Sequence, residues 1–505
     1  MNVKLGRAQA RRFVEGVSSS SRKGSRRPLQ AMAFSAIALV LGACAVGPDY
    51  RQPSAPVAAS FGAGNAAYDS AAPEPLFWTQ FDDPQLSRLI EQASRANHDL
   101  RIALANLNQA RALRHEARLD YLPAISAEAG YSRSLQSRDQ APGLDREQRE
   151  SDLYTGGFDA AWELDFFGRV RRANESASAT EQALLAQLRD AQISVAAEVA
   201  RSYFELRGTQ ERYAVAQRNA DNQRETLRYA QLRLDAGSGT EFDVARAQAQ
   251  LSTTRAVLPQ LDAAVENGIH RLSVLSGLPP TALQEPLRPV AALPELPRLV
   301  HIGKPEDLLR RRADVRAVER LLAADTAQIG VAVADWFPRV SFRGELGFAV
   351  QDADDVGSSV GETWGYGPGI TWAAFDLSRV AARVERARAK RDGSVAAYEQ
   401  TVLRALEETE NALVNYGRSR QQLDHLQDSV TASDRAAALA RARFDGGASD
   451  FLDVLDAERA QLAAQDRYAQ ARIAAATGLV ALYKALGGGW DADGDQALAA
   501  AMPTP

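Results

Sequence analysis

The spacing of hydrophobic positions along the chain alternates between two periods. Two long segments, 170–235 and 380–445, place apolar residues three, four or seven positions apart, as in helices that bury a narrow stripe. Upstream of each segment the period falls to two, which is typical of strands. At about 1.5 Å per residue, each long helix would reach roughly 100 Å. The pattern therefore predicts a mainly α chain with two short strand regions.

The chain also repeats itself. Residues 233–251 (RLDAGSGTEFDVARAQAQL) return 210 residues later, from Arg443, as RFDGGASDFLDVLDAERAQ. Glycine, which adopts the left-handed conformation that ends helices, stands between two helical segments in each copy. Each copy is expected to be the tip of a long helical hairpin, with Thr240 or Asp450 capping the return helix. The expected tip residues are Gly237, Ser238, Gly239, Thr240, Gly447, Ala448, Ser449 and Asp450.

The two strand regions follow prolines that end helices at Pro123 and Pro338. Alternation is clearest from 339 to 350 and from 154 to 166. The positions expected on the apolar face are Val340, Phe342, Gly344, Leu346, Phe348 and Val350, with Tyr154, Phe158, Ala160, Trp162, Leu164 and Phe166. Charged and small polar residues alternate with them. This fits barrel strands between lipid and water, although a soluble sheet packed on one side fits the strands equally well by themselves.

Weaker partner strands, 124–135 and 362–375, complete two hairpins around polar loops at 136–150 and 351–361. Four strands cannot close a membrane barrel, which needs at least about eight. The chain is therefore expected to oligomerise. Two copies would give eight strands with a filled interior, whereas three would give twelve strands and a lumen.

The N-terminus has the features of an export signal. Eight Lys and Arg residues precede an apolar run from Ala31 to Ala43, which is too short for a permanent membrane helix. Cys44 is the only cysteine and follows Leu41-Gly42-Ala43, as in a bacterial lipoprotein cleavage box. The alternative is a buried, inert cysteine beside an ordinary signal. Ala45 replaces the Asp that retains lipoproteins at the inner membrane, which favours the outer membrane.

These patterns divide the chain into segments. The expected segments are a signal peptide (1–43), a lipid-anchored tether (44–76), a first repeat (77–280) with a strand hairpin (124–167) and a helical hairpin (170–277), a linker (281–304), a second repeat (305–489) with a strand hairpin (339–376) and a helical hairpin (380–487), and a tail (490–505).

Composition argues against several function classes. Removal of residues 1–43 changes the net charge from −5 to −12, which disfavours nucleic acid as a partner. The five histidines have no metal-ligand spacing and are expected on solvated helix surfaces. No nucleophile with a base and no phosphate-binding loop is evident. The sequence therefore predicts neither an enzyme nor a cofactor- or metal-binding protein.

Six sequence landmarks resemble the TolC-like outer-membrane factors, in particular the OprM/NodT-type efflux lipoproteins. They are CAVGPDY (44–50), FDDPQLSRLIEQA (from 81), ELDFFGRVRR (163–172), LLRRRADVRAVERLLAA (308–324), DWFPRVS (335–341) and ALGGGW (485–490). The resemblance implies a homotrimer with a twelve-stranded outer-membrane β-barrel, four strands per chain, and a trimeric α-barrel in the periplasm. It also implies docking on a periplasmic adaptor (membrane fusion) protein that is linked to an inner-membrane RND pump.

The resemblance also assigns a periplasmic gate of helix tips and acidic rings. Carried onto this sequence, the acids are Asp453 and Asp456, with Asp243 as the repeat equivalent of Asp453. Asp456 corresponds to Arg246 in the first repeat, so an ion pair across the tips is an alternative. Capping of a helix is the alternative for Asp243 and Asp453. An Arg and a Tyr that lock TolC are matched here by Ser449 and Phe444.

The expected function is that of a passive exit duct of a tripartite efflux system for drugs or other small toxic compounds. One alternative is a duct for type I protein or oligosaccharide secretion. Another, of a different class, is a periplasmic coiled-coil adaptor or scaffold. An adaptor would have one helical hairpin between small soluble β-domains, whereas this sequence has two hairpins and two strand pairs.

Overall fold

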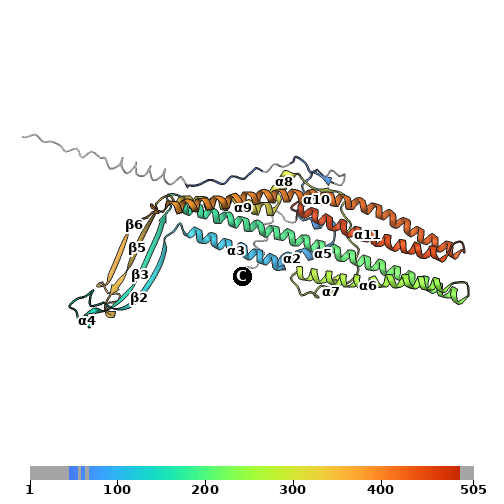
Figure 1. The fold of residues 1–505 in the computed structure, drawn as a ribbon, viewed down its shortest axis with the longest axis horizontal. Helices are drawn as coiled ribbons and strands as arrows, with labels where there is room; N and C mark the ends of the chain where they lie inside the picture. The colour runs from blue at the N-terminus through green and yellow to red at the C-terminus, as the bar shows by residue number, and fades with distance from the viewer. Residues whose placement is uncertain (1–44, 55–57, 63–67, 489–505) are drawn as a thin grey trace, which may run out of the picture.

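The computed structural model describes residues 45–54, 58–62 and 68–488. The predicted signal peptide, Cys44 and the 490–505 tail lie outside these residues. The described chain is an elongated bundle of helices with a sheet at one end and two helical tips at the other (Figure 1). No described helix is both long enough and apolar enough to cross a membrane.

A four-stranded antiparallel sheet joins the two sequence repeats. Its strands are β2 (Ala124–Leu135), β3 (Glu150–Leu164), β5 (Arg339–Val350) and β6 (Glu362–Thr371), in the order β2-β3-β5-β6. The pairing of β3 with β5 unites the two hairpins. Strand β6 ends at Thr371, earlier than expected, because the Asp376 N–H donates to the Ala373 carbonyl and closes a turn. The short helices α4 (Arg146–Arg149) and η2 (Ala353–Asp355) lie in the loops.

Outside this sheet, most of the described chain forms a layer that is four helices wide. The helices are α2 (Pro84–Ala96), α3 (His98–Leu119), α5 (Arg169–Asp235), α6 (Glu241–Leu275), α9 (Ala313–Ala334), α10 (Leu377–Asp445) and α11 (Phe451–Ala485). Near the sheet the order across the layer is α3-α5-α9-α10, and toward the tips it is α6-α5-α11-α10. Helices α5 and α10 therefore run the full length, while α3 and α6, and likewise α9 and α11, each fill half of it.

The main apolar core lies midway along the helices. There the 3₁₀ helix η1 (Phe77–Phe81) and α2 pack against α5 and α11. Phe77 stacks on Tyr483 with ring centroids 5.2 Å apart. The Tyr203 hydroxyl donates to Asp83 at 2.6 Å, and burial, together with this bond, raises the pKa of Tyr203 to about 12. This belt holds the two helical hairpins together at mid-length.

Parts of the predicted tether and of the predicted linker are packed against the rest of the described chain. Residues 45–50, expected to belong to a tether, lie against α5 and α9 through the contacts described below. Further on, β1 (Tyr68–Asp69) pairs in parallel with β4 (Val300–His301) of the linker. The Tyr68 hydroxyl donates to the Leu413 carbonyl at 2.6 Å. His301, expected on a helix surface, therefore lies in a strand, 3.4 Å from Asp69. Short helices α7 (Gln284–Leu287) and α8 (Pro305–Arg311) flank β4 in sequence.

Candidate functional site: sheet faces, barrel junction and helical tips

The sheet has one apolar and one polar face, as the alternation predicts. In the β3–β5 register Phe158 lies opposite Leu346 and Trp162 opposite Phe342, so these side chains share a face. Phe158 is 61% exposed in the single chain, as expected for a side chain that needs an apolar environment outside the protein. Strands β2 and β6 extend the same face. Their contributions are Ile125, Tyr131, Trp364, Tyr366 and Ile370.

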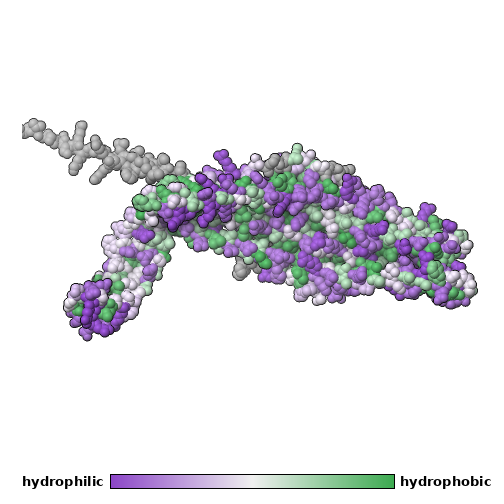
Figure 2. Space-filling model, in the orientation of Figure 1, coloured by the Kyte–Doolittle hydropathy of each residue, from purple (hydrophilic) through white to green (hydrophobic). Residues whose placement is uncertain are grey.

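The opposite face carries charge. Asp159 lies opposite Glu345 across the β3–β5 pair, and Arg343 lies two residues from Glu345 on the same side. In β6 this face is largely glycine, at positions 365, 367 and 369. In Figure 2 the sheet is paler than the helical body, where hydrophilic residues gather on the face in view. One face of the sheet therefore suits lipid and the other suits water.

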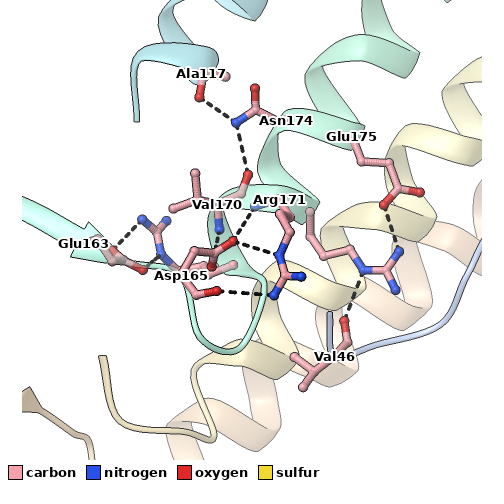
Figure 3. Close-up of polar contacts among 10 residues, drawn as sticks. Val46, Ala117, Glu163, Asp165, Val170, Arg171, Asn174 and Glu175 are labelled. Atoms are coloured by element: carbon pink, nitrogen blue, oxygen red, sulfur yellow. Dashed lines mark hydrogen bonds and ion pairs between the residues drawn. The ribbon is translucent and has the colours of Figure 1, made fainter. Parts of the chain in front are cut away.

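The turn from β3 into α5 is held by a dense set of polar contacts (Figure 3). Asp165 accepts from the backbone N–H groups of Val170 at 3.0 Å and Arg171 at 2.9 Å in the first turn of α5, where the helix supplies no acceptors of its own and its dipole favours a negative charge. Glu163 binds Arg169 with two bonds of 2.7 Å. This is the ELDFFGRVRR landmark, and its charged residues fix the angle between sheet and helix. They therefore have a structural role at the base of the sheet.

The residues after Cys44 form a strap across the two repeats. Arg172 on α5 is 5% exposed, and its guanidinium donates to the Val46 carbonyl at 3.1 Å and to Asp49 at 2.7 Å. Gly47, with φ +94°, rests on Gly330 of α9, where an added Cβ would lie 2.5 Å from the Gly330 Cα. The strap thus touches a helix of each repeat, and only glycine allows the approach.

Tyr50 continues the strap onto α9. Its hydroxyl donates to Glu319, while the guanidinium of Arg320 lies 5.2 Å from the centre of its ring. Burial, reinforced by the bond to Glu319, raises the pKa of Tyr50. Sequence reasoning recognised the 44–50 landmark but no partner for it. Arg172 and Gly330 lie more than a hundred residues away, and no local pattern indicated their contact.

The two helical tips have the same backbone and different caps. Gly237 and Gly447 have φ values of +71° and +72°, as the repeat predicts. At the first tip Thr240 caps α6: its hydroxyl accepts from the Asp243 N–H at 3.2 Å, and Asp243 accepts in return. At the second tip Asp450 occupies the cap position, but its side chain accepts no such bond within the described chain. The expectation that Asp450 caps α11 through its side chain is therefore wrong.

The acidic residues proposed for a gate fall into two groups. Asp243 is engaged in the cap of α6, which favours the structural alternative for this residue. Asp453 and Asp456 are both exposed on the first turns of α11. Arg246 lies over the Phe242 ring, 5.4 Å from its centre, and makes no ion pair with Asp456 within the described single chain. An ion pair between these two residues within one chain is therefore not formed.

Arg233 and Arg443, which occupy equivalent positions in the sequence repeat, make equivalent contacts at the two tips. The Arg233 guanidinium donates to the Ser238 carbonyl at 3.0 Å, and that of Arg443 lies 3.4 Å from the Ala448 carbonyl. Each arginine thus closes its own tip. Arg233 also lies 4.9 Å from the ring centre of Phe444, which connects the first tip to the second. A pocket of about 290 Å³ lies between the tips, lined by Arg233, Asp243 and Asp450 among others.

A sheet with one lipid-compatible face, carried on a long helical shaft, defines a membrane channel component with a periplasmic extension. The model of the family "Outer membrane efflux protein" matches residues 89–278 and 305–488. The chain belongs to this family. It is an outer-membrane protein with the TolC-like fold, as the sequence resemblance implied.

Comparisons with individual proteins agree with this assignment. The chain is 32% identical to outer membrane protein OprJ of Pseudomonas aeruginosa, over 92% of this chain and 97% of OprJ. It is also 32% identical to the toluene efflux pump outer membrane protein TtgI of Pseudomonas putida, over 90% and 97% of the two chains. Among solved structures, the outer-membrane channel OprN is 45% identical, with a TM-score of 0.82, over 88% of this chain and 100% of OprN.

The faces of the sheet can be tested with one charge. Phe342→Lys would place an ammonium group on the apolar face, at a cost of about 2–4 kcal/mol if the side chain lies at mid-depth in the bilayer. We expect a lower yield of folded protein in outer-membrane fractions. Ser341→Lys, on the opposite face, is the matched control and should assemble normally. Equal yields would show that the lipid-facing side is misassigned.

The strap can be tested at Gly330. An added Cβ would lie 2.6 Å from Arg172 Cγ and 2.9 Å from the Val46 carbonyl oxygen, so Gly330→Val should displace the strap at a cost of about 1–3 kcal/mol. Limited trypsin digestion at the exposed Arg51 should then be faster, as followed by mass spectrometry. Gly393→Val, where the added Cβ meets nothing within 4 Å, is the control. Unchanged digestion would contradict a docked strap.

The difference between the caps predicts different responses to alanine. Thr240→Ala should cost about 1 kcal/mol of local stability and speed hydrogen exchange in the first turn of α6 about fivefold. Asp450→Ala should leave exchange in the first turn of α11 nearly unchanged, because its side chain caps nothing. Equal acceleration at both tips would show that Asp450 is a cap after all.

Proposed function

We propose that three copies of this chain form one passive duct that spans the outer membrane and the periplasm. In this proposal the duct is the exit of a tripartite efflux system. Its helical tips dock on a periplasmic adaptor, and an inner-membrane RND pump supplies the energy. The observation that carries the proposal is the pair of unpaired sheet edges in the single chain.

Strands β2 and β6 each have one neighbour in the sheet. Within a bilayer, an open strand edge leaves backbone N–H and C=O groups without partners, at several kcal/mol each. The apolar residues near these edges are among the most exposed of the chain, with Ile125 at 72% and Tyr366 at 75%. Pairing of β2 with β6 of a neighbouring copy satisfies both edges. Three copies give twelve strands and leave an open lumen.

The helical layer has the same two edges. Helix α10 lies at one side and α3 with α6 at the other, each with a neighbour on one side only. Both edges expose large apolar side chains. These are Leu403, Val414 and Leu439 on α10, and Ile102, Leu113, Phe242 and Val257 on α3 and α6. Joining the edges of three copies buries these residues and makes a twelve-helix wall that continues the barrel.

The polar face of the sheet would line the lumen. The opposed Asp159 and Glu345, with Arg343 beside them, give a wettable wall. We therefore propose a conduit that catalyses no reaction and leaves selection to the pump. The named activity of the TtgI relative favours small apolar toxic compounds as cargo. Secretion of protein or oligosaccharide is the alternative duct function, while the family assignment removes the separate adaptor class.

The lipid anchor and the segment boundaries complete the proposal. We propose lipidation of Cys44 after removal of residues 1–43, with the strap of residues 45–50 holding the anchor beside the β3–α5 turn. The two repeats, 77–280 and 305–489, would each contribute half of the wall, joined by the linker 281–304. The docking surface for the adaptor would be the tips at Gly237–Thr240 and Gly447–Asp450, most of whose residues are exposed.

The second tip would narrow the periplasmic end. Asp453 and Asp456 from three copies would form acidic rings there, since both side chains are exposed on the first turns of α11. Asp243 is less suited because the cap of α6 engages its carboxylate. An ion pair between Arg246 and Asp456 would require the two residues to come from different copies.

Planar-bilayer recording tests the proposal. The purified protein should form trimers and open discrete channels, and Asp456→Ala should raise single-channel conductance and weaken any block by divalent cations. Asp262→Ala makes the same change of charge on α6, next to Arg288 and away from the tips, and should leave conductance unchanged. Absence of channels in reconstituted trimers would contradict a duct. An unchanged trace for Asp456→Ala would place the constriction elsewhere.

A further inference from the structure

The seam between the two hairpins changes character along its length. At mid-length α5 and α11 meet in the apolar core that contains Phe204 and Leu479. Closer to the tips the contacts are polar: Arg212 binds Asp466 at 2.7 Å, and Asn219 donates to Gln465 at 2.9 Å. The lower part of the seam therefore depends on a few directional contacts and has little apolar burial to hold it.

Glu458 is the most buried of these polar groups. It lies on α11 and is 2% exposed. Its Oε1 accepts from Arg441 on α10, with Nε at 3.0 Å and Nη2 at 2.5 Å. The same oxygen lies 2.9 Å from the Thr226 hydroxyl of α5. One carboxylate oxygen thus ties both helices of the second hairpin to the long helix of the first.

The hydrogen bonding around the Glu458 carboxylate is incomplete. The Oε2 of Glu458 is buried and has no partner in the described part of the chain, and neither has the side-chain amide of Gln223, one turn from Thr226 on α5. The Thr226 hydroxyl has a single proton and a second acceptor, the Asn222 carbonyl at 3.2 Å. Buried polar groups without partners disfavour the state that contains them. Separation of the hairpins would admit water to these atoms.

Only a small apolar cluster lies between this tie and the ends of the hairpins. Its buried members are Ala230, Ala247, Phe444, Phe451, Val454 and Leu455. The Arg233–Phe444 contact adds a cation–π interaction between the tips. Between Asn219 and the tips, the two hairpins are therefore held together chiefly by this cluster and by the carboxylate of Glu458.

We propose that Glu458, held by Arg441 and Thr226, is a latch that keeps the second helical hairpin against the first near the tips, and that its release lets the tips part. Glu458 is a positioning residue, because it acts through the placement of the hairpins and does not line the path of the cargo. The consequence for conduction rests on the proposed duct function. The latch itself concerns only the distance between the two tips of one chain, which can be measured whether or not the protein conducts.

The test measures that distance. Nitroxide labels on Ser238→Cys and Ala448→Cys, both at exposed tip positions, report the separation of the tips by pulsed electron spin resonance on the full-length protein. Singly labelled proteins give the distances between copies. Glu458→Gln and Arg441→Gln should each shift the distribution within a chain to longer distances and raise the mean conductance in planar bilayers.

Glu225→Gln is the matched control. It removes an exposed ion pair with Arg228, internal to α5 and close in sequence to Thr226, and should leave the distribution unchanged. Thermal melting of the trimer separates general destabilisation from opening, because a merely structural role would lower the melting temperature without moving the labels. If Glu458→Gln fails to assemble, Thr226→Val, which keeps the ion pair, should give a smaller shift in the same direction.

An unchanged distance distribution in assembled Glu458→Gln and Arg441→Gln, or in Thr226→Val if those do not assemble, would overturn the latch. A wild-type protein that shows no conductance would instead contradict the duct, and the distance measurement would still decide the latch. A shift seen equally in Glu225→Gln would show that any lost charge at this level loosens the tips. That result would also overturn the specific role of Glu458.

Discussion

The demand that every backbone N–H and C=O inside a bilayer find a partner governs this structure more than any single side chain. The described part of the chain supplies four strands to the antiparallel sheet, which ends at β2 on one side and β6 on the other. The helical layer ends at the same two sides. A wall that is incomplete along its whole length, with exposed apolar residues at both edges, is the form expected of one segment of a larger cylinder. The proposed assembly of several copies follows from this geometry, and the family resemblance sets their number at three.

Much of the local structure could be predicted because it depends on residues close together in sequence. The period of the apolar positions located the long helices, and the alternation assigned the faces of β3 and β5 correctly. Gly237 and Gly447 marked the tips because a left-handed residue must end each helix. The resemblance added the trimer, which periodicity alone had left open between two copies and three.

Contacts between distant residues escaped prediction. Gly47 and Gly330 are unremarkable glycines until the strap brings them together. Glu458 lies within the repeated stretch that begins at Arg443, and nothing in the residues near it showed that Arg441 and Thr226 would bond to its buried carboxylate. Asp450 was expected to act as a cap because residues of its type often do, yet its side chain makes no capping bond within the described residues. The sequence repeat thus predicted the common backbone of the two tips. It did not predict the different side-chain contacts on which the proposed gate depends.

Those differences give the two hairpins separate tasks. The first tip is closed by its own capping box, and its acid is used there. The second tip leaves its acids exposed and is fastened to the first by one buried carboxylate and a small apolar cluster. The first hairpin is thereby suited to be a fixed support and the second to be the movable part.

Electron cryomicroscopy of the purified protein in lipid would show the assembly itself. We expect three copies around a central opening, with β2 of each copy hydrogen-bonded to β6 of the next. A closed particle made of a single chain, or an assembly without a passage along its axis, would contradict it.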